Sequence, residues 1–155
     1  MKLSPSSFNS KRYQTAKRLK VDKSFTPCIT EDNDELYPNG VFVFNITKMI
    51  QHIESNKNEF ELLEIETIDF HIYNSSINES HLDSVDVSKP AIIAEISPGR
   101  YNLIDGHHRL EKARRMKIRS IPAYKLNVDQ HIQFLTEIEA YIAYIEYWNS
   151  KISAD

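Results

Sequence analysis

The sequence is poor in cysteine and in long apolar runs, and each shortage excludes a class of protein. Among its 155 residues there is one cysteine, Cys28. A single cysteine cannot form an intramolecular disulfide, and it excludes zinc sites built on cysteine pairs. No segment approaches the ~18 consecutive apolar residues of a membrane span, and residues 1–20 lack the continuous apolar segment of a secretory signal. We therefore expect a cytoplasmic protein with no membrane association.

Glycine is also scarce, so each glycine is expected to mark a backbone position that other residues cannot occupy. An average content of ~7% would give about eleven glycines in this length, whereas the chain has three. Gly40 in YPNG, Gly99 in SPGR and Gly106 in DGHH all predict turns. The third of these turns lies inside a cluster of charged and histidine residues.

Basic residues are concentrated in two segments of a chain whose net charge is −3. Residues 2–23 carry seven Lys/Arg against one acid, and residues 105–125 carry seven against two. Local basic patches indicate an anionic ligand, although a solvated helix face and a flexible arm are the alternative. We predict a basic, partly flexible N-terminal arm over residues 1–35, followed by a single domain over residues 36–155.

The pattern of apolar residues predicts an α+β fold with a small mixed β-sheet, flanking helices and a long C-terminal helix. Strands are expected where β-branched and aromatic residues gather or alternate, over residues 41–46, 91–96, 101–104, 121–126 and within 60–73, most clearly 65–73. Helices are expected where apolar residues recur every three or four positions, over residues 46–55, 79–85, 107–117 and 130–152. The aromatic side chains of the last helix predict either internal packing or a homodimer interface.

The sequence Asp-Gly-His-His-Arg combines residue types that bind phosphate at the start of a helix. A helix N-terminus offers unpaired backbone N–H groups and a partial positive charge. Gly106 permits the tight entry turn, and Arg109 can donate a planar fork of hydrogen bonds to a phosphate. His107 and His108 add neutral or cationic donors, and Asp105 can cap the helix, fix a histidine tautomer or help hold a divalent cation. The alternative is a capped helix start with surface histidines.

The elements around this cluster resemble the core of the ParB/sulfiredoxin-like superfamily, in the order AIIAEI-SPGR-YNLI-DGHHR-LEKARRMKI-RSIPAYKL. The resemblance covers about residues 60–126, and the DGHHR form is similar to that of free serine kinases and ParB-like nuclease-domain proteins. It implies a hairpin leading into a phosphate-binding turn and helix. It also implies ATP, ADP or another nucleotide as the ligand, with Mg²⁺ if the protein is an enzyme. Cys28 lies far from the motif, so sulfiredoxin chemistry is not expected, and no helix-turn-helix of the partition proteins is evident after Leu126.

Three functions remain open on this evidence. The first is a nucleotide-dependent phosphotransferase or phosphohydrolase, which needs positioned charges and a base. The second is a non-catalytic switch in which a bound nucleotide controls binding to DNA or a protein. The third is a metal-dependent nuclease that uses Asp105 and the histidines, although no spacing such as HExxH assigns metal ligands.

Catalysis would require a carboxylate base in addition to Asp105. The resemblance to the kinase branch implies a glutamate that precedes the motif, and Glu79 is the first candidate. Asp83 and Asp86 in the same polar loop are alternatives. The expected partner is a nucleotide or a phosphorylated small molecule, with DNA as an alternative.

Overall fold

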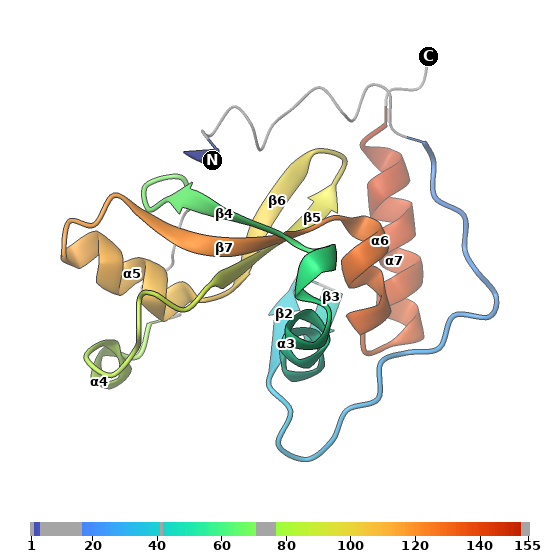
Figure 1. Ribbon diagram of the computed structural model, residues 1–155. Helices are drawn as coiled ribbons and strands as arrows, with labels where there is room; N and C mark the ends of the chain where they lie inside the picture. The colour runs from blue at the N-terminus through green and yellow to red at the C-terminus, as the bar shows by residue number, and fades with distance from the viewer. Residues whose placement is uncertain (1, 4–16, 41, 71–76, 153–155) are drawn as a thin grey trace.

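Two β-sheets and a set of helices make up the described part of the chain. The structure is a computed structural model that describes residues 2–3, 17–40, 42–70 and 77–152. One sheet has five strands and the other has two (Figure 1). The predicted α+β class with a mixed sheet and a C-terminal helix is confirmed. Within the described ranges, no helix is long and apolar enough to cross a membrane.

The five-stranded sheet is built around a β-hairpin that leads into the DGHHR sequence. Its strand order is β1-β4-β7-β5-β6. The strands are β1 (Lys2–Leu3), β4 (Glu61–Glu66), β5 (Ala91–Ser97), β6 (Arg100–Asp105) and β7 (Ser120–Leu126). β5 pairs antiparallel with β6 and parallel with β7, and β4 pairs antiparallel with β7. Gly99 closes the hairpin at φ +75°, a conformation that glycine adopts without strain.

The two faces of this sheet are covered by different helices. Helix α5 (His107–Arg115) buries Leu110 and Ala113 against one face. The other face packs on α3 (Ile46–Ser55) and α7 (Ile138–Ser150), together with the small sheet of β2 (Leu36–Asn39) and β3 (Phe42–Asn45). Along β5, Ile93 contributes to the core under α5, whereas Ile92 and Ala94 contribute to the core under α3 and α7. This alternation is the period of two expected for a strand buried on both faces.

The strand predicted most clearly over residues 65–73 is wrong in its position. β4 spans Glu61–Glu66, and residues 67–70 form a turn. The Thr67 hydroxyl lies 3.0 Å from the Ile118 carbonyl, to which it donates, and the Arg114 guanidinium donates to the carbonyl of Phe70. These contacts hold residues 67–70 as a turn that packs on the segment after α5. Residues 71–73 of the prediction lie outside the described residues.

The single helix predicted over residues 130–152 is also wrong, because the chain is extended between two helical segments. A short helix, α6 (Val128–His131), and a 3₁₀ turn, η3 (Ile132–Phe134), precede α7. Leu135 forms a bridge with Phe44, and the Thr136 backbone N–H donates to the Val43 carbonyl at 3.0 Å. The pairing with β3 therefore replaces the helical hydrogen bonds at this point.

Residues 17–28, the described beginning of the predicted arm, run along α7 (Figure 1). The backbone N–H of Leu19 donates to Asn149 and the side chain of Asn149 donates back to the Leu19 carbonyl, at 2.8 and 2.9 Å. The ring of Phe25 stacks on Tyr141 with centroids 3.8 Å apart. Trp148 of α7 is also buried inside the chain. Tyr141 and Trp148 of α7 therefore pack inside the chain. The homodimer stays a prediction.

Candidate functional site

The DGHHR sequence lies at the turn from β6 into α5. Asp105 ends the strand, Gly106 is the helix N-cap at φ +101°, and His107 begins the helix. A Cβ added to Gly106 would lie 2.7 Å from the Cβ of Ala91. Only glycine therefore fits here, both because φ is positive and because β5 passes directly beside the turn. The expected strand-turn-helix geometry is present.

A cavity of about 290 Å³ opens at this turn, and we call it the helix-start cavity. Its lining comes from three parts of the chain: Glu35 and Tyr37, then Val85, and then Ile104 with the five residues of the DGHHR sequence. Residues far apart in the sequence thus meet at the N-terminus of α5. Since the first N–H groups of a helix have no partner within the helix, this is a place where an anion is stabilised.

Arg109 is held in place at the cavity by Asp105. A nitrogen of its guanidinium lies 2.9 Å from the Asp105 carboxylate, and the two side chains are only 18% and 14% exposed. The Nε atom of Arg109 is buried and has no hydrogen-bond partner among the described residues. Because a guanidinium has five N–H donors and Asp105 occupies one side of it, Arg109 keeps donors for an anionic ligand.

Both histidines line the cavity, and each also contacts another part of the chain. His107 packs its ring against Tyr37 with centroids 5.1 Å apart, and burial lowers its pKa, so the ring is neutral near pH 7. Nε2 of His108 accepts a hydrogen bond from the backbone N–H of Asn78 at 2.9 Å. His108 therefore positions the start of α4 (Glu79–Leu82). The fixed positive charge of the site comes from Arg109.

Glu35 is a carboxylate at this cavity that the sequence analysis did not select. The backbone N–H of Glu35 donates a hydrogen bond to the Thr47 hydroxyl at 2.7 Å, and the Glu35 carbonyl accepts one from the backbone N–H of Ile46 at 2.8 Å. These bonds fix Glu35 to the start of α3. Its side chain is at the solvent-exposed rim, where partial desolvation and then the negative charge of Asp105 raise its pKa. A carboxyl with raised proton affinity beside an anion site is a candidate general base.

Glu79, the base suggested by the sequence, lies at the other end of α5. Arg115 donates to both of its carboxylate oxygens, at 2.6 and 2.8 Å, and these hydrogen bonds lower the pKa of Glu79. His107 and Arg115 are eight positions apart in this helix, which corresponds to about 12 Å. The Asp86 carboxylate accepts a hydrogen bond from the Ser88 hydroxyl.

The loop around Glu79 reaches the cavity through an apolar residue. Val85 is part of the cavity lining, whereas Glu79, Asp83 and Asp86, all of which the structure describes, are not. The loop before β5 therefore reaches this edge of the sheet, but none of its three carboxylates lines the cavity.

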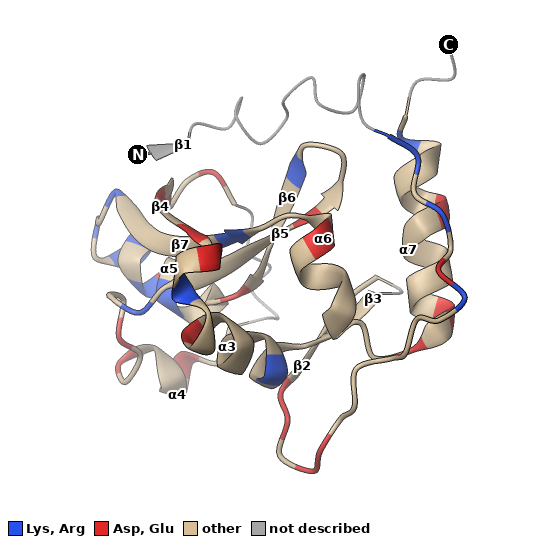
Figure 2. Ribbon diagram, turned by 45° about the vertical axis from the view of Figure 1, so that its right-hand side comes forward, with Lys and Arg blue, Asp and Glu red and all other residues tan. Residues whose placement is uncertain are grey.

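The basic side chains of α5 fasten neighbouring loops. The ammonium of Lys112 donates to the carbonyls of Asp83 and Val85, and the guanidinium of Arg114 donates to that of Thr67. Arg115 of α5 also pairs with Glu79, the acidic residue of α4, and Figure 2 shows several Lys and Arg residues along α5. These internal bonds favour a structural role for this basic segment over a nucleic-acid surface.

No protein-family model, curated protein or solved structure matches the chain. Among the described residues, no group of three or more His, Cys, Asp or Glu side chains is arranged to hold a metal ion. The resemblance to the ParB/sulfiredoxin-like superfamily therefore stays a prediction.

Proposed function

We propose that the protein binds a nucleotide or another phosphorylated ligand at the helix-start cavity and transfers or hydrolyses its phosphate. The observation that supports this most is the meeting of three features in one cavity: the N-terminus of α5, the guanidinium of Arg109 and the carboxylate of Glu35. Phosphate chemistry depends on charge neutralisation and positioning more than on covalent catalysis. The resemblance to the ParB/sulfiredoxin-like superfamily implies the same class of ligand.

The phosphate is bound by the helix and by Arg109. The backbone N–H groups of His107 and His108 have no partner within the helix and carry the positive end of its dipole. Asp105 holds the Arg109 guanidinium at 2.9 Å, so that its conformational freedom is already reduced before the ligand binds. Together these groups recognise a doubly or triply charged anion.

A nucleotide would bring Mg²⁺ to this site. Mg²⁺ bound to phosphates needs only one or two protein carboxylates. Asp105 lies in the same cavity as Glu35 and close enough for its charge to raise the pKa of that residue, so a pair of carboxylates faces the ligand. Asp105 would hold the ion, which neutralises phosphate charge when bound.

Glu35 is the general base in this proposal, in place of Glu79. It accepts the proton of a water molecule or of an acceptor hydroxyl as that oxygen attacks the phosphate. Its exposure at the cavity rim leaves room for an acceptor to approach from solvent. Because it acts on the acceptor, its loss removes turnover and leaves the affinity for the phosphate nearly unchanged.

The test compares two substitutions of glutamate by glutamine. Nucleotide turnover is measured in the parent protein, in Glu35→Gln and in the matched control Glu79→Gln, and nucleotide affinity is measured in all three. We expect turnover to be abolished only in Glu35→Gln, with similar affinities throughout. Turnover that persists in Glu35→Gln would contradict the proposed base. A parent protein that binds nucleotides without any turnover would favour the non-catalytic switch.

A further inference from the structure

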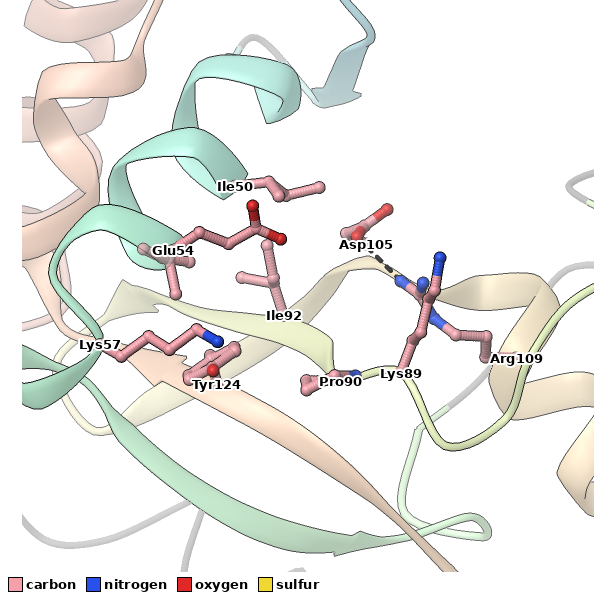
Figure 3. Close-up of a pocket in the computed structure, with 10 residues that line it drawn as sticks. Ile50, Glu54, Lys57, Lys89, Pro90, Ile92, Asp105, Arg109 and Tyr124 are labelled. Carbon is pink, nitrogen blue, oxygen red and sulfur yellow. Dashed lines mark hydrogen bonds and ion pairs between the residues drawn. The ribbon is translucent and has the colours of Figure 1, made fainter.

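A second cavity adjoins the helix-start cavity at the Asp105–Arg109 ion pair, which lines both (Figure 3). It has a volume of about 300 Å³ and lies between α3 and the strands β5 and β7. We call it the α3 cavity. Ile50, Ile92 and Tyr124 give it an apolar and aromatic lining. Cavities of this kind bind planar organic groups, because a ring buries its faces against such side chains.

Charged side chains surround this apolar lining. Glu54 is near the end of α3, and Figure 3 shows its carboxylate pointing into the cavity. Lys89, in the loop before β5, extends beside Arg109 in the same view. The junction between the two cavities therefore carries two cationic side chains beside Asp105, whereas the α3 end of the cavity carries Glu54 and also the ammonium of Lys57, which lies beside Tyr124 in Figure 3. This distribution fits a ligand that is anionic at the junction and has both hydrogen-bond donors and acceptors at its far end.

We propose that the α3 cavity holds the nucleoside of a purine nucleotide and that Glu54 selects a base with an exocyclic amino group. This inference rests on the proposed function, which places the phosphates in the helix-start cavity. The phosphate chain passes Lys89 and Arg109, and the base lies against Ile92 and Tyr124. An ionised carboxylate only accepts hydrogen bonds. Glu54 therefore accepts a hydrogen bond from the amino group of adenine or guanine. Hypoxanthine has neither amino group: a carbonyl oxygen, which a carboxylate repels, stands in place of the adenine amino group, and a hydrogen stands in place of the guanine amino group.

The test measures, by titration calorimetry, the affinities of inorganic tripolyphosphate, ATP, GTP and ITP. Tripolyphosphate reports the phosphate site alone, and ITP is the purine nucleotide without an amino group. We expect all three nucleotides to bind more tightly than tripolyphosphate, since the ring buries apolar surface. We also expect ATP or GTP to bind more tightly than ITP, by about tenfold for a hydrogen bond to a charged group.

Substitution of Glu54 separates hydrogen bonding from simple charge. Glu54→Gln removes a negative charge near the phosphates, so electrostatics alone would strengthen the binding of every anion. A glutamine amide donates hydrogen bonds as well as accepting them. If Glu54 accepts from the base, the substitution therefore reduces the preference for ATP or GTP over ITP, whereas a charge effect alone leaves that preference unchanged. The matched control is Glu59→Gln, which removes an equal charge from an exposed residue of the 3₁₀ turn η1 (Lys57–Glu59) that follows α3. It should leave the preference for the amino group unchanged.

The outcomes distinguish this inference from the proposed function. Binding of tripolyphosphate with no gain for any nucleotide would overturn the inference and leave the phosphate site in place. Equal affinities of ATP, GTP and ITP, or a Glu54→Gln variant that keeps the parent's preference for ATP or GTP over ITP, would overturn the role of Glu54. If neither tripolyphosphate nor any nucleotide binds, the proposed function fails and the inference fails with it.

Discussion

Replacing Gly106 by alanine tests whether the turn into α5 is as tightly constrained as its geometry indicates. The residue has φ +101°, where an L-amino acid is strained by about 1–2 kcal/mol. The new Cβ would also lie 2.7 Å from the Cβ and 3.1 Å from the Cα of Ala91, which is fully buried in β5. Because Ala91 cannot move without displacing β5, which pairs with a strand on each side, overpacking adds about 1–3 kcal/mol. The total loss of stability is therefore about 2–5 kcal/mol.

Gly40→Ala provides a matched control for the steric part of this cost. Gly40 also has a positive φ, +67°, but no described atom lies within 4 Å of an added Cβ. Its replacement costs only the backbone strain, about 1–2 kcal/mol. The free energies of unfolding of both variants are measured by urea denaturation and compared with that of the parent. Equal losses in Gly106→Ala and Gly40→Ala would refute the close approach of Ala91 to the turn.

Two further predictions concern a ligand contact and a buried histidine. Arg109→Ala should weaken nucleotide binding by about 1.5–3 kcal/mol in calorimetry. The exposed Arg119→Ala serves as its control, and equal affinities would exclude Arg109 as a ligand. Burial lowers the pKa of His131 to about 4, so the unfolded chain takes up a proton first, near its ordinary value of 6.5. Stability should therefore fall by about 3 kcal/mol as the pH drops from 6.5 through 4. A His131→Gln variant that keeps the same slope in pH-dependent denaturation would contradict this.

The segment from β5 to β7 could be predicted from the sequence because its signals are local. Alternation and β-branching mark the two strands of the hairpin, and Gly99 marks the turn between them. Gly106 marks the entry to α5, where Leu110 and Ala113 recur at helical spacing and are both buried. Each signal depends on residues within a few positions of one another, so no knowledge of the rest of the chain is needed.

Contacts between distant residues could not be predicted in this way. Residues 36–39 contain Pro38 and end at Asn39, the first residue of an Asn-Gly pair, which indicates a turn, yet they form β2 by pairing with β3. The break before α7 depends on the pairing of Leu135 with Phe44, which is 91 residues away in the sequence. Nothing in the local pattern of residues 130–152 reports such a pairing, and tertiary contacts override helix propensity there.

In the candidate site, too, the contiguous residues could be predicted from the sequence, and the residues placed by distant contacts could not. The DGHHR sequence is contiguous, so its position at a strand-to-helix turn could be expected. Glu35 reaches the cavity because the start of α3 fixes its backbone, through Thr47 and Ile46. In the sequence it belongs to an acidic segment 70 residues before Asp105, without a local signal that connects the two. Glu79 was placed by resemblance alone, and its pairing with Arg115 depends on the orientation of α4.

The scarcity of glycine allows one spectrum to test whether a phosphate binds at the start of α5. Protein labelled with ¹⁵N only at glycine gives three backbone amide signals, from Gly40, Gly99 and Gly106. Each signal is assigned by its loss in the corresponding alanine variant, and the parent is then titrated with tripolyphosphate. We predict a saturable shift of the Gly106 signal, while those of Gly40 and Gly99 stay in place. A Gly106 signal that remains unchanged at high tripolyphosphate concentration would contradict the proposed phosphate site.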